Sequence, residues 1–226
     1  MNAEVLNTRV SKWGEGPVWW KDHLYYVDIK GFRLLRFDPK TGKETSWEMD
    51  QRIGFALPCL SGKWIWGGDN GIFYLDLETG LSTPIVDPEP NLPDNRFNDA
   101  AISPDGRLFA GTIALKKVKG SAKLYRIDSD LSCHTAFPNV TNSNGIDWTS
   151  DGKTCYYIDT PSYSIRKFNY DNASGSLQDP HILLDTKDKS QGVPDGMCID
   201  AEGNMWVAFC HGGCVVKFTS EGKEVT

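Results

Sequence analysis

The sequence predicts an all-β fold, a β-propeller, because one pattern recurs five times along the chain. Each copy opens with a polar residue or a glycine. Seven positions later comes an acidic residue or a serine, followed by glycine in four of the copies, and then a run rich in aromatic residues. The copies begin at Glu15, Gly54, Asn98, Asn144 and Asp195. Self-similarity at about 40 to 50 residues is typical of propeller blades and other repeat arrays.

Each copy also ends in the same way. Apolar residues alternate with polar ones and then run into a turn of Asp, Ser, Thr and Gly, as in IFYLDLETG at 72–80. Alternation of period two before such a turn predicts a strand followed by a hairpin. Each copy therefore predicts a small antiparallel sheet of four strands, and sheets of this kind packed around a central channel form a propeller. We expect the blades at 15–49, 53–86, 98–137, 144–184 and 195–226, within a single domain that spans 1–226.

The composition argues against several other classes of protein. The 226 residues carry a net charge of −6 without a clustered basic run, which disfavours a nucleic-acid-binding surface. No apolar run approaches the roughly 20 residues that a membrane-spanning helix needs, and the first residues do not resemble a signal peptide. We therefore expect a cytoplasmic protein with no nucleic-acid or membrane partner, whose six cysteines are reduced and mostly buried.

The first position of the repeat carries the candidate chemistry. Equivalent positions of successive blades lie on a circle about the axis of a propeller, so their side chains converge at one mouth of the channel. Glu15, Asn98, Asn144 and Asp195 share this position, whereas Gly54 contributes no side chain. Two carboxylates and two amides form an oxygen-rich group of the kind that hard divalent cations prefer. Without a cation the two carboxylates would repel, and one would have a raised pKa.

Simpler interpretations exist for each of these residues. Asn144-Gly145 and Asp195-Gly196 are common turn dipeptides, and Glu15 could simply begin a loop. The shared position in four copies favours a metal site over four unrelated turns. A zinc site through Cys210, His211 and Cys214 is a poorly spaced alternative. The sequence has no GxSxG motif, which disfavours serine nucleophile chemistry.

Four ordered motifs resemble one known family. They are GEGPVW at 14–19, RFND at 96–99, SNGIDW at 143–148 and PDGMCID at 194–200. Together they resemble the regucalcin (senescence marker protein 30), gluconolactonase and luciferin-regenerating enzyme family. The resemblance implies a six-bladed propeller of four-stranded blades with a divalent cation at its axis, so that the sixth blade would be missing from this chain. The alternative, which the five repeats leave open, is a five-bladed ring. The resemblance also implies that Glu15, Asn144 and Asp195 ligate the metal, that Arg96 and Asn98 hold substrate oxygens, and that Asp195 doubles as the general acid and base.

The chain departs from this family pattern in the loop of blade three. The acid that binds substrate in regucalcin-like proteins is replaced there by Lys116. We expect Lys116 to contact the substrate, and we interpret the basic loop as favouring a lactone that bears an acidic group.

The predicted function is hydrolysis of sugar lactones by a metal-dependent lactonase. The cation would polarise the ring carbonyl, and Asp195 would transfer the proton. Ca²⁺ is the favoured cation, with Zn²⁺, Mg²⁺ and Mn²⁺ as alternatives. The alternative functions are a calcium-binding or scaffolding propeller without catalysis, and a metal-dependent phosphotriesterase or aryl esterase.

Overall fold

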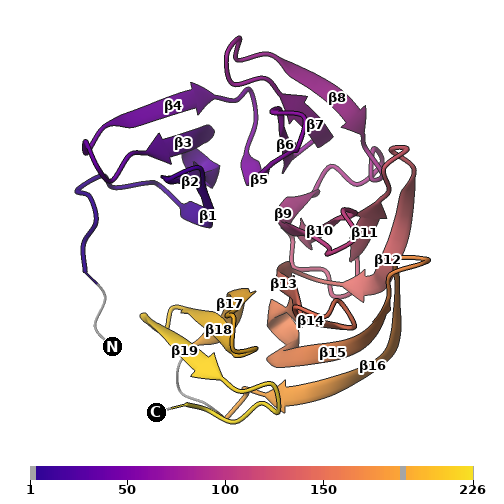
Figure 1. The fold of residues 1–226 in the computed structure, drawn as a ribbon. Helices are drawn as coiled ribbons and strands as arrows, with labels where there is room; N and C mark the ends of the chain where they lie inside the picture. The colour runs from indigo at the N-terminus through magenta and orange to yellow at the C-terminus, as the bar shows by residue number, and fades with distance from the viewer. Residues whose placement is uncertain (1–3, 189–191, 226) are drawn as a thin grey trace. The chain divides into compact units, whose positions relative to one another are not determined.

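The computed structural model describes residues 4–188 and 192–225 (Figure 1). These residues form five antiparallel sheets, and in each sheet the strands that follow one another along the chain are neighbours. The chain divides into two compact units, Met1–Phe97 and Asn98–Thr226. The prediction of a single domain over 1–226 stays a prediction.

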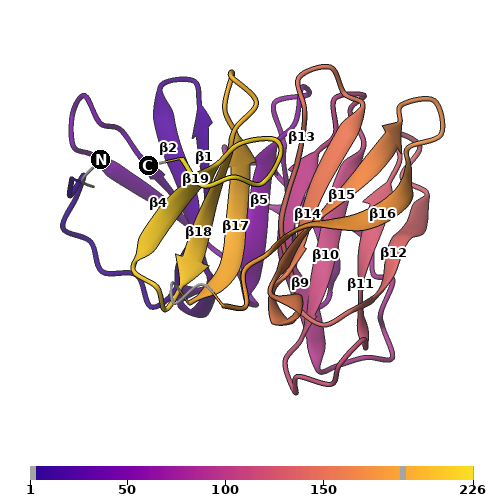
Figure 2. The ribbon, with the colours of Figure 1, turned by 90° about the horizontal axis from the view of Figure 1, so that it is seen from below.

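The first unit contains two four-stranded sheets (Figures 1 and 2). The first sheet consists of β1 (Gly14–Trp20), β2 (His23–Asp28), β3 (Arg33–Phe37) and β4 (Glu44–Glu48), with the short 3-10 helix η1 (Ile29–Gly31) before β3. The second consists of β5 (Ile53–Pro58), β6 (Trp64–Gly68), β7 (Gly71–Leu75) and β8 (Ser82–Val86). The predicted hairpins are confirmed. In the β7–β8 turn the Asp76 carboxylate accepts the backbone N–H of Glu78 at 2.8 Å, and Gly80 takes the positive φ that the turn requires.

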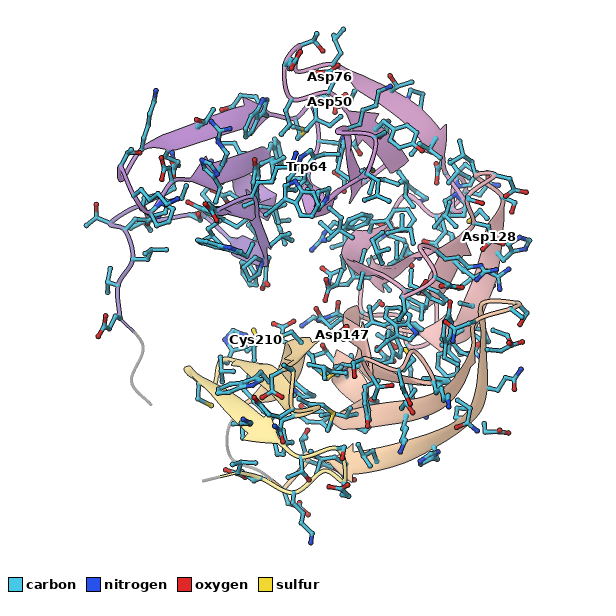
Figure 3. The ribbon with its side chains drawn as sticks, in the orientation of Figure 1. Asp50, Trp64, Asp76, Asp128, Asp147 and Cys210 are labelled. Carbon is cyan, nitrogen blue, oxygen red and sulfur yellow. The ribbon has the colours of Figure 1, made fainter. Side chains whose placement is uncertain are left out.

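The aromatic runs of the two repeats form the core of the first unit. Tyr25, Val27 and Leu34 from the first sheet pack with Ile53, Trp64 and Trp66 from the second. The rings of Tyr25 and Trp64 lie 4.2 Å apart between their centres, and Trp64 is labelled in Figure 3. This packing holds the first strands of the two blades, β1 and β5, next to each other within the unit.

The second unit contains the remaining sheets, and its first strand, β9, begins three residues before the unit does. One sheet consists of β9 (Asn95–Ile102), β10 (Leu108–Ala114), β11 (Ala122–Ile127) and β12 (Cys133–Val140). The next consists of β13 (Ser143–Trp148), β14 (Thr154–Asp159), β15 (Ser164–Asp171) and β16 (Ser176–Asp185), with η2 (Thr160–Ser162) between β14 and β15. The last consists of β17 (Val193–Ile199), β18 (Met205–Cys210) and β19 (Cys214–Phe218).

Aromatic residues also form the core of the second unit. Phe109, Trp148, Tyr157, Phe168 and Tyr170 are buried in one cluster, in which the Phe109 and Trp148 rings lie 5.1 Å apart. The cluster joins the sheets of blades three and four, so β10 and β13 approach each other closely. The positions of Asn98 and Asn144 are therefore set by core packing within one unit.

The number of blades corrects the predicted fold. The all-β propeller class is supported, but the prediction of six four-stranded blades is wrong: the described residues form five blades, four with four strands and one with three. The physical reason is that each sequence repeat folds into one sheet, and this sequence has five repeats. The sixth blade came from the family resemblance and had no repeat of its own.

Over residues 4–188 and 192–225, the structure has no helix that is both long enough and apolar enough to cross a membrane.

Candidate metal and substrate site

The first strands of four blades are irregular at the candidate site position. The pairing of the first strand with the second shifts at Glu15/Val18 in β1, Ile53/Phe55 in β5, Ser143/Ile146 in β13 and Pro194/Met197 in β17. Such β-bulges re-aim a side chain away from the regular sheet and are common beside active sites. Asn144 and Asp195 therefore lie inside bulged strands, and the interpretation of these residues as turn dipeptides is wrong.

In the second unit, β13 and β17 approach each other closely enough to require a glycine. A Cβ placed on Gly145 would lie 2.6 Å from the Met197 Cβ and 2.9 Å from the carbonyl oxygen of Asp195. Any other residue at 145 would therefore push the two strands apart. The close approach places Asn144 beside the segment that carries Asp195.

A buried threonine connects the same two strands. The Thr160 hydroxyl accepts a hydrogen bond from Asn144 Nδ2 at 2.8 Å and donates one to the carbonyl oxygen of Pro194 at 2.8 Å. Both hydrogen bonds are buried, so the water that could replace them is excluded. Thr160 follows β14 in η2 and shares no repeat position with the candidate residues, which is why sequence reasoning missed it.

Asn98 fixes the orientation of the Asn144 amide from the other side. Asn98 Nδ2 donates to the backbone carbonyl of Ser143 at 2.8 Å and to Asn144 Oδ1 at 3.2 Å. With its Nδ2 bound to Thr160, Asn144 presents the carbonyl oxygen, which has a second lone pair for another partner. The structure thus brings together two of the residues that the sequence singled out.

Asp195 is half-buried, and its surroundings act on its ionisation in opposite directions. Burial raises the pKa of Asp195, while a hydrogen bond from the Cys210 thiol and the charge of His211 lower it. Cys210, labelled in Figure 3, is the last residue of β18. It pairs with Val193 of β17, and Val193 stands two residues before Asp195. This pairing brings Cys210 to the end of β17 that carries Asp195, beside the bulge between Pro194 and Met197.

A second acid of this unit was not among the predicted site residues. Burial raises the pKa of Asp99 to about 6, against a hydrogen bond from the Ala100 N–H, and the negative charge of Asp195 raises it further. Asp99 is the last residue of the RFND motif, directly after Asn98. That position was the signal that could have identified it.

The predicted site residues of the first unit are Glu15 and Arg96. Arg96 is 9% exposed, its Nη1 donates to the Phe97 carbonyl at 2.7 Å, and its Nε has no hydrogen-bond partner among the described residues. Burial lowers the pKa of Arg96 to about 10, and the positive charge of Arg52 lowers it too, whereas Asp69 and Glu15 raise it. Arg96 and Glu15 therefore share one electrostatic neighbourhood within the first unit.

Lys116 lies on the exposed loop between β10 and β11, together with Lys117 and Lys119. Nothing in the loop tests its contact with a substrate, so that contact stays a prediction.

The donor set of the second unit fits a hard divalent cation. Nowhere in the described part of the chain do three His, Cys, Asp or Glu side chains gather around one point that could hold a metal. The predicted set instead combines carboxylates with an amide oxygen, a mixture that Ca²⁺ and Mg²⁺ accept. Asn144 presents its amide oxygen, and Asp195 is a carboxylate whose ionised form is penalised by burial and would be stabilised by a cation. Because no such group of three is found among the described residues, a zinc site formed by Cys210, His211 and Cys214 is disfavoured.

Known proteins match nearly the whole chain. A model of the SMP-30/Gluconolactonase/LRE-like region matches residues 13–226. A regucalcin of Xenopus laevis is 35% identical over 235 residues, which cover 100% of this chain and 78% of the relative. The Bacillus subtilis (strain 168) protein named "Putative sugar lactone lactonase YvrE" is 36% identical over 205 residues, covering 90% of this chain and 70% of the relative.

A solved structure agrees with these matches. The crystal structure of a calcium-binding protein, regucalcin, from Agrobacterium tumefaciens aligns with a TM-score of 0.93 at 25% identity, covering 98% of this chain and 76% of that chain. The match by the family model over residues 13–226 and the sequence identity of the relatives agree with the four motifs of the sequence. The chain belongs to the SMP-30/gluconolactonase/LRE-like family, and this membership supports a lactonase-type hydrolase function on a small-molecule lactone.

Proposed function

We propose that the protein hydrolyses sugar lactones with one bound divalent cation, Ca²⁺ being favoured. In the second unit Asn144 and Asp195 ligate the cation, and Glu15 of the first unit stays the predicted third ligand. The observation that carries the proposal is the hydrogen-bond chain from Asn98 through Asn144 and Thr160 to Pro194, which fixes the Asn144 amide next to the strand that carries Asp195. Family membership supports the lactone as substrate.

The cation, when bound, supplies Lewis-acid polarisation of the lactone carbonyl and a lowered pKa for the attacking water. The other roles belong to residues of the chain. Asp195 takes the proton from the attacking water and returns it to the leaving ring oxygen. Asn98, whose Nδ2 is bound to Ser143 and Asn144, meets a substrate hydroxyl through its amide oxygen. Arg96 binds a substrate oxygen through its buried guanidinium, whose Nε has no hydrogen-bond partner among the described residues.

A panel of lactones tests this proposal directly. Hydrolysis of D-glucono-1,5-lactone and D-galactono-1,4-lactone is measured by acid release with Ca²⁺, Mg²⁺, Mn²⁺ or Zn²⁺, and with a chelator. We expect turnover that requires a metal and that Asp195→Asn lowers at least a thousandfold in kcat. The matched control is Asp151→Asn, which changes an exposed turn acid of the same unit.

The outcomes separate the alternatives. Near-normal turnover by Asp195→Asn would show that Asp195 is not the general acid and base. Calcium binding by calorimetry without hydrolysis of any lactone would favour the non-catalytic calcium-binding protein. Turnover of phosphotriesters or aryl esters in preference to lactones would favour the other hydrolase.

A further inference from the structure

The first unit carries a second arginine in the same repeat position as Arg96. Arg96 stands two residues before Asn98, and Arg52 stands two residues before Gly54, so both precede the site position of their blade by two. The equivalent residues of the other copies, Trp13, Asn142 and Val193, carry no charge. Arg52 directly precedes β5, beside the bulge at Ile53/Phe55 where Gly54 contributes no side chain.

Asp69 holds Arg52 in a fixed orientation. The Asp69 carboxylate accepts Arg52 Nε at 3.1 Å and the Arg52 backbone N–H at 3.1 Å, and Nη2 lies 2.8 Å from its second oxygen. This fork occupies one edge of the guanidinium and leaves Nη1 directed elsewhere. The side chain of Arg52 is 35% exposed, so a solute can reach it.

Arg96 supplies the buried half of the pair. Its Nε is buried without a hydrogen-bond partner among the described residues, an arrangement that costs stability unless a ligand supplies the acceptor. The Phe97 ring, next to Arg96, lies 6.1 Å from the Phe55 ring of β5 between their centres, so the segments that carry the two arginines adjoin. The positive charge of Arg52 lowers the pKa of Arg96, in keeping with this placement. Two neighbouring guanidinium groups, one anchored and one with an uncommitted donor, bind planar or tetrahedral oxyanions well.

We propose that Arg52 and Arg96 form a two-arginine cradle for an anionic group of the substrate, a carboxylate or a phosphate, so that the protein prefers lactones that carry such a group. The inference rests on the proposed lactonase function and names its substrate class. Asp69 positions Arg52, and Glu15 of the same unit stays the predicted metal ligand beside the cradle. Arg52 is thereby a specificity residue that the sequence analysis did not assign.

Kinetics on three lactones test the cradle. D-Glucono-1,5-lactone is neutral, D-glucaro-1,4-lactone carries a carboxylate, and 6-phospho-D-glucono-1,5-lactone carries a phosphate. We expect Arg52→Gln to lower kcat/KM at least tenfold for one or both anionic lactones and less than twofold for the neutral one. The anion that loses more identifies the natural group. An equal loss on all three lactones, or no loss on any, overturns the proposal.

Matched variants separate specificity from folding. Arg33→Gln removes an arginine of the same unit from an exposed ion pair with Glu48 and should change neither activity nor selectivity. Arg52→Lys keeps the charge but loses the fork with Asp69, so it should retain part of the preference. If the Tm of Arg52→Gln is well below that of Arg33→Gln, Arg52→Lys is used for the kinetic test in its place. Lys116→Ala tests whether the basic loop, rather than Arg52, carries the preference, which would also overturn the proposal.

A binding measurement makes the inference independent of turnover. With metal removed by a chelator, inorganic phosphate is titrated into the wild-type protein, Arg52→Gln and Arg33→Gln by calorimetry. We expect wild type and Arg33→Gln to bind phosphate alike and Arg52→Gln to bind at least tenfold more weakly. If no lactone is hydrolysed, the proposed function fails while this titration still decides on the cradle. Equal phosphate binding by all three proteins, or none, overturns it.

Discussion

Replacing Thr160 by valine tests whether the buried hydrogen-bond chain organises the candidate site. Valine keeps the shape of the side chain but removes the hydroxyl that joins Asn144 to Pro194. Both partners would then be left without that hydrogen bond in a buried place, which costs about 1–3 kcal/mol each. We expect the free energy of unfolding to fall by about 2–4 kcal/mol. In a chain of this size that corresponds to a fall in Tm of roughly 5 to 15 °C.

The same change should weaken metal binding, because Thr160 orients a predicted ligand without touching the cation. Loss of such a supporting contact lowers metal affinity by about 10- to 100-fold. Urea unfolding gives the stability, and calorimetric titration with Ca²⁺ gives the affinity. Thr160→Ser keeps the hydroxyl and should stay near wild type in both. A Thr160→Val protein with unchanged Ca²⁺ affinity, or with less than 0.5 kcal/mol of lost stability, would refute the role given to this chain.

Two further predictions concern the same unit. Gly145→Ala places a Cβ 2.6 Å from that of Met197 and should cost about 1–3 kcal/mol in urea unfolding. Gly196→Ala, whose Cβ would meet nothing within 4 Å, should be nearly neutral, and equal effects would contradict the strand contact. The raised pKa of Asp99, about 6 against an ordinary 3.8, means that the folded state holds this proton more tightly than the unfolded state. In chelator-treated protein, the Asp99 proton therefore adds about 3 kcal/mol to the free energy of unfolding below about pH 4. This stabilisation is lost as the pH rises through 6. Asp99→Asn should remove that fall between pH 4 and 7, and an unchanged pH profile of stability would contradict it.

The repeat pattern was the most reliable information in the sequence. Period-two alternation and Asp–Gly turns predicted sheets built from successive strands, and each of the five copies forms one sheet. The shared position also brought Asn98 and Asn144 into contact, although 46 residues separate them. Alternation and turn chemistry are local properties, so a single sequence carries them in full.

Other features depend on packing between segments and left no local signal. Thr160 and Cys210 reach Asn144 and Asp195 only because β13, β17 and β18 adjoin in the folded unit. The blade count was wrong because it relied on the resemblance rather than on the repeats. The cytoplasmic location, the absence of nucleic-acid partners and the role of Lys116 stay predictions, since no contact in the fold bears on them.

The repeat phase puts the predicted cation ligand Glu15 and the proposed anion-binding arginines at neighbouring positions of the repeat in the first unit. One position of the repeat carries Glu15, and the position two residues earlier carries Arg52 and Arg96 in the next two copies. Opposite charges therefore occupy neighbouring positions of the repeat in successive copies. Glu15 raises the pKa of Arg96, as expected for neighbouring opposite charges. A cation bound to Glu15 would weaken the stabilisation that the Glu15 charge gives to the charged Arg96 guanidinium. An anionic substrate group would restore this stabilisation. Metal and anionic substrate should therefore strengthen each other's binding, and the Arg52→Gln variant should lose much of this coupling.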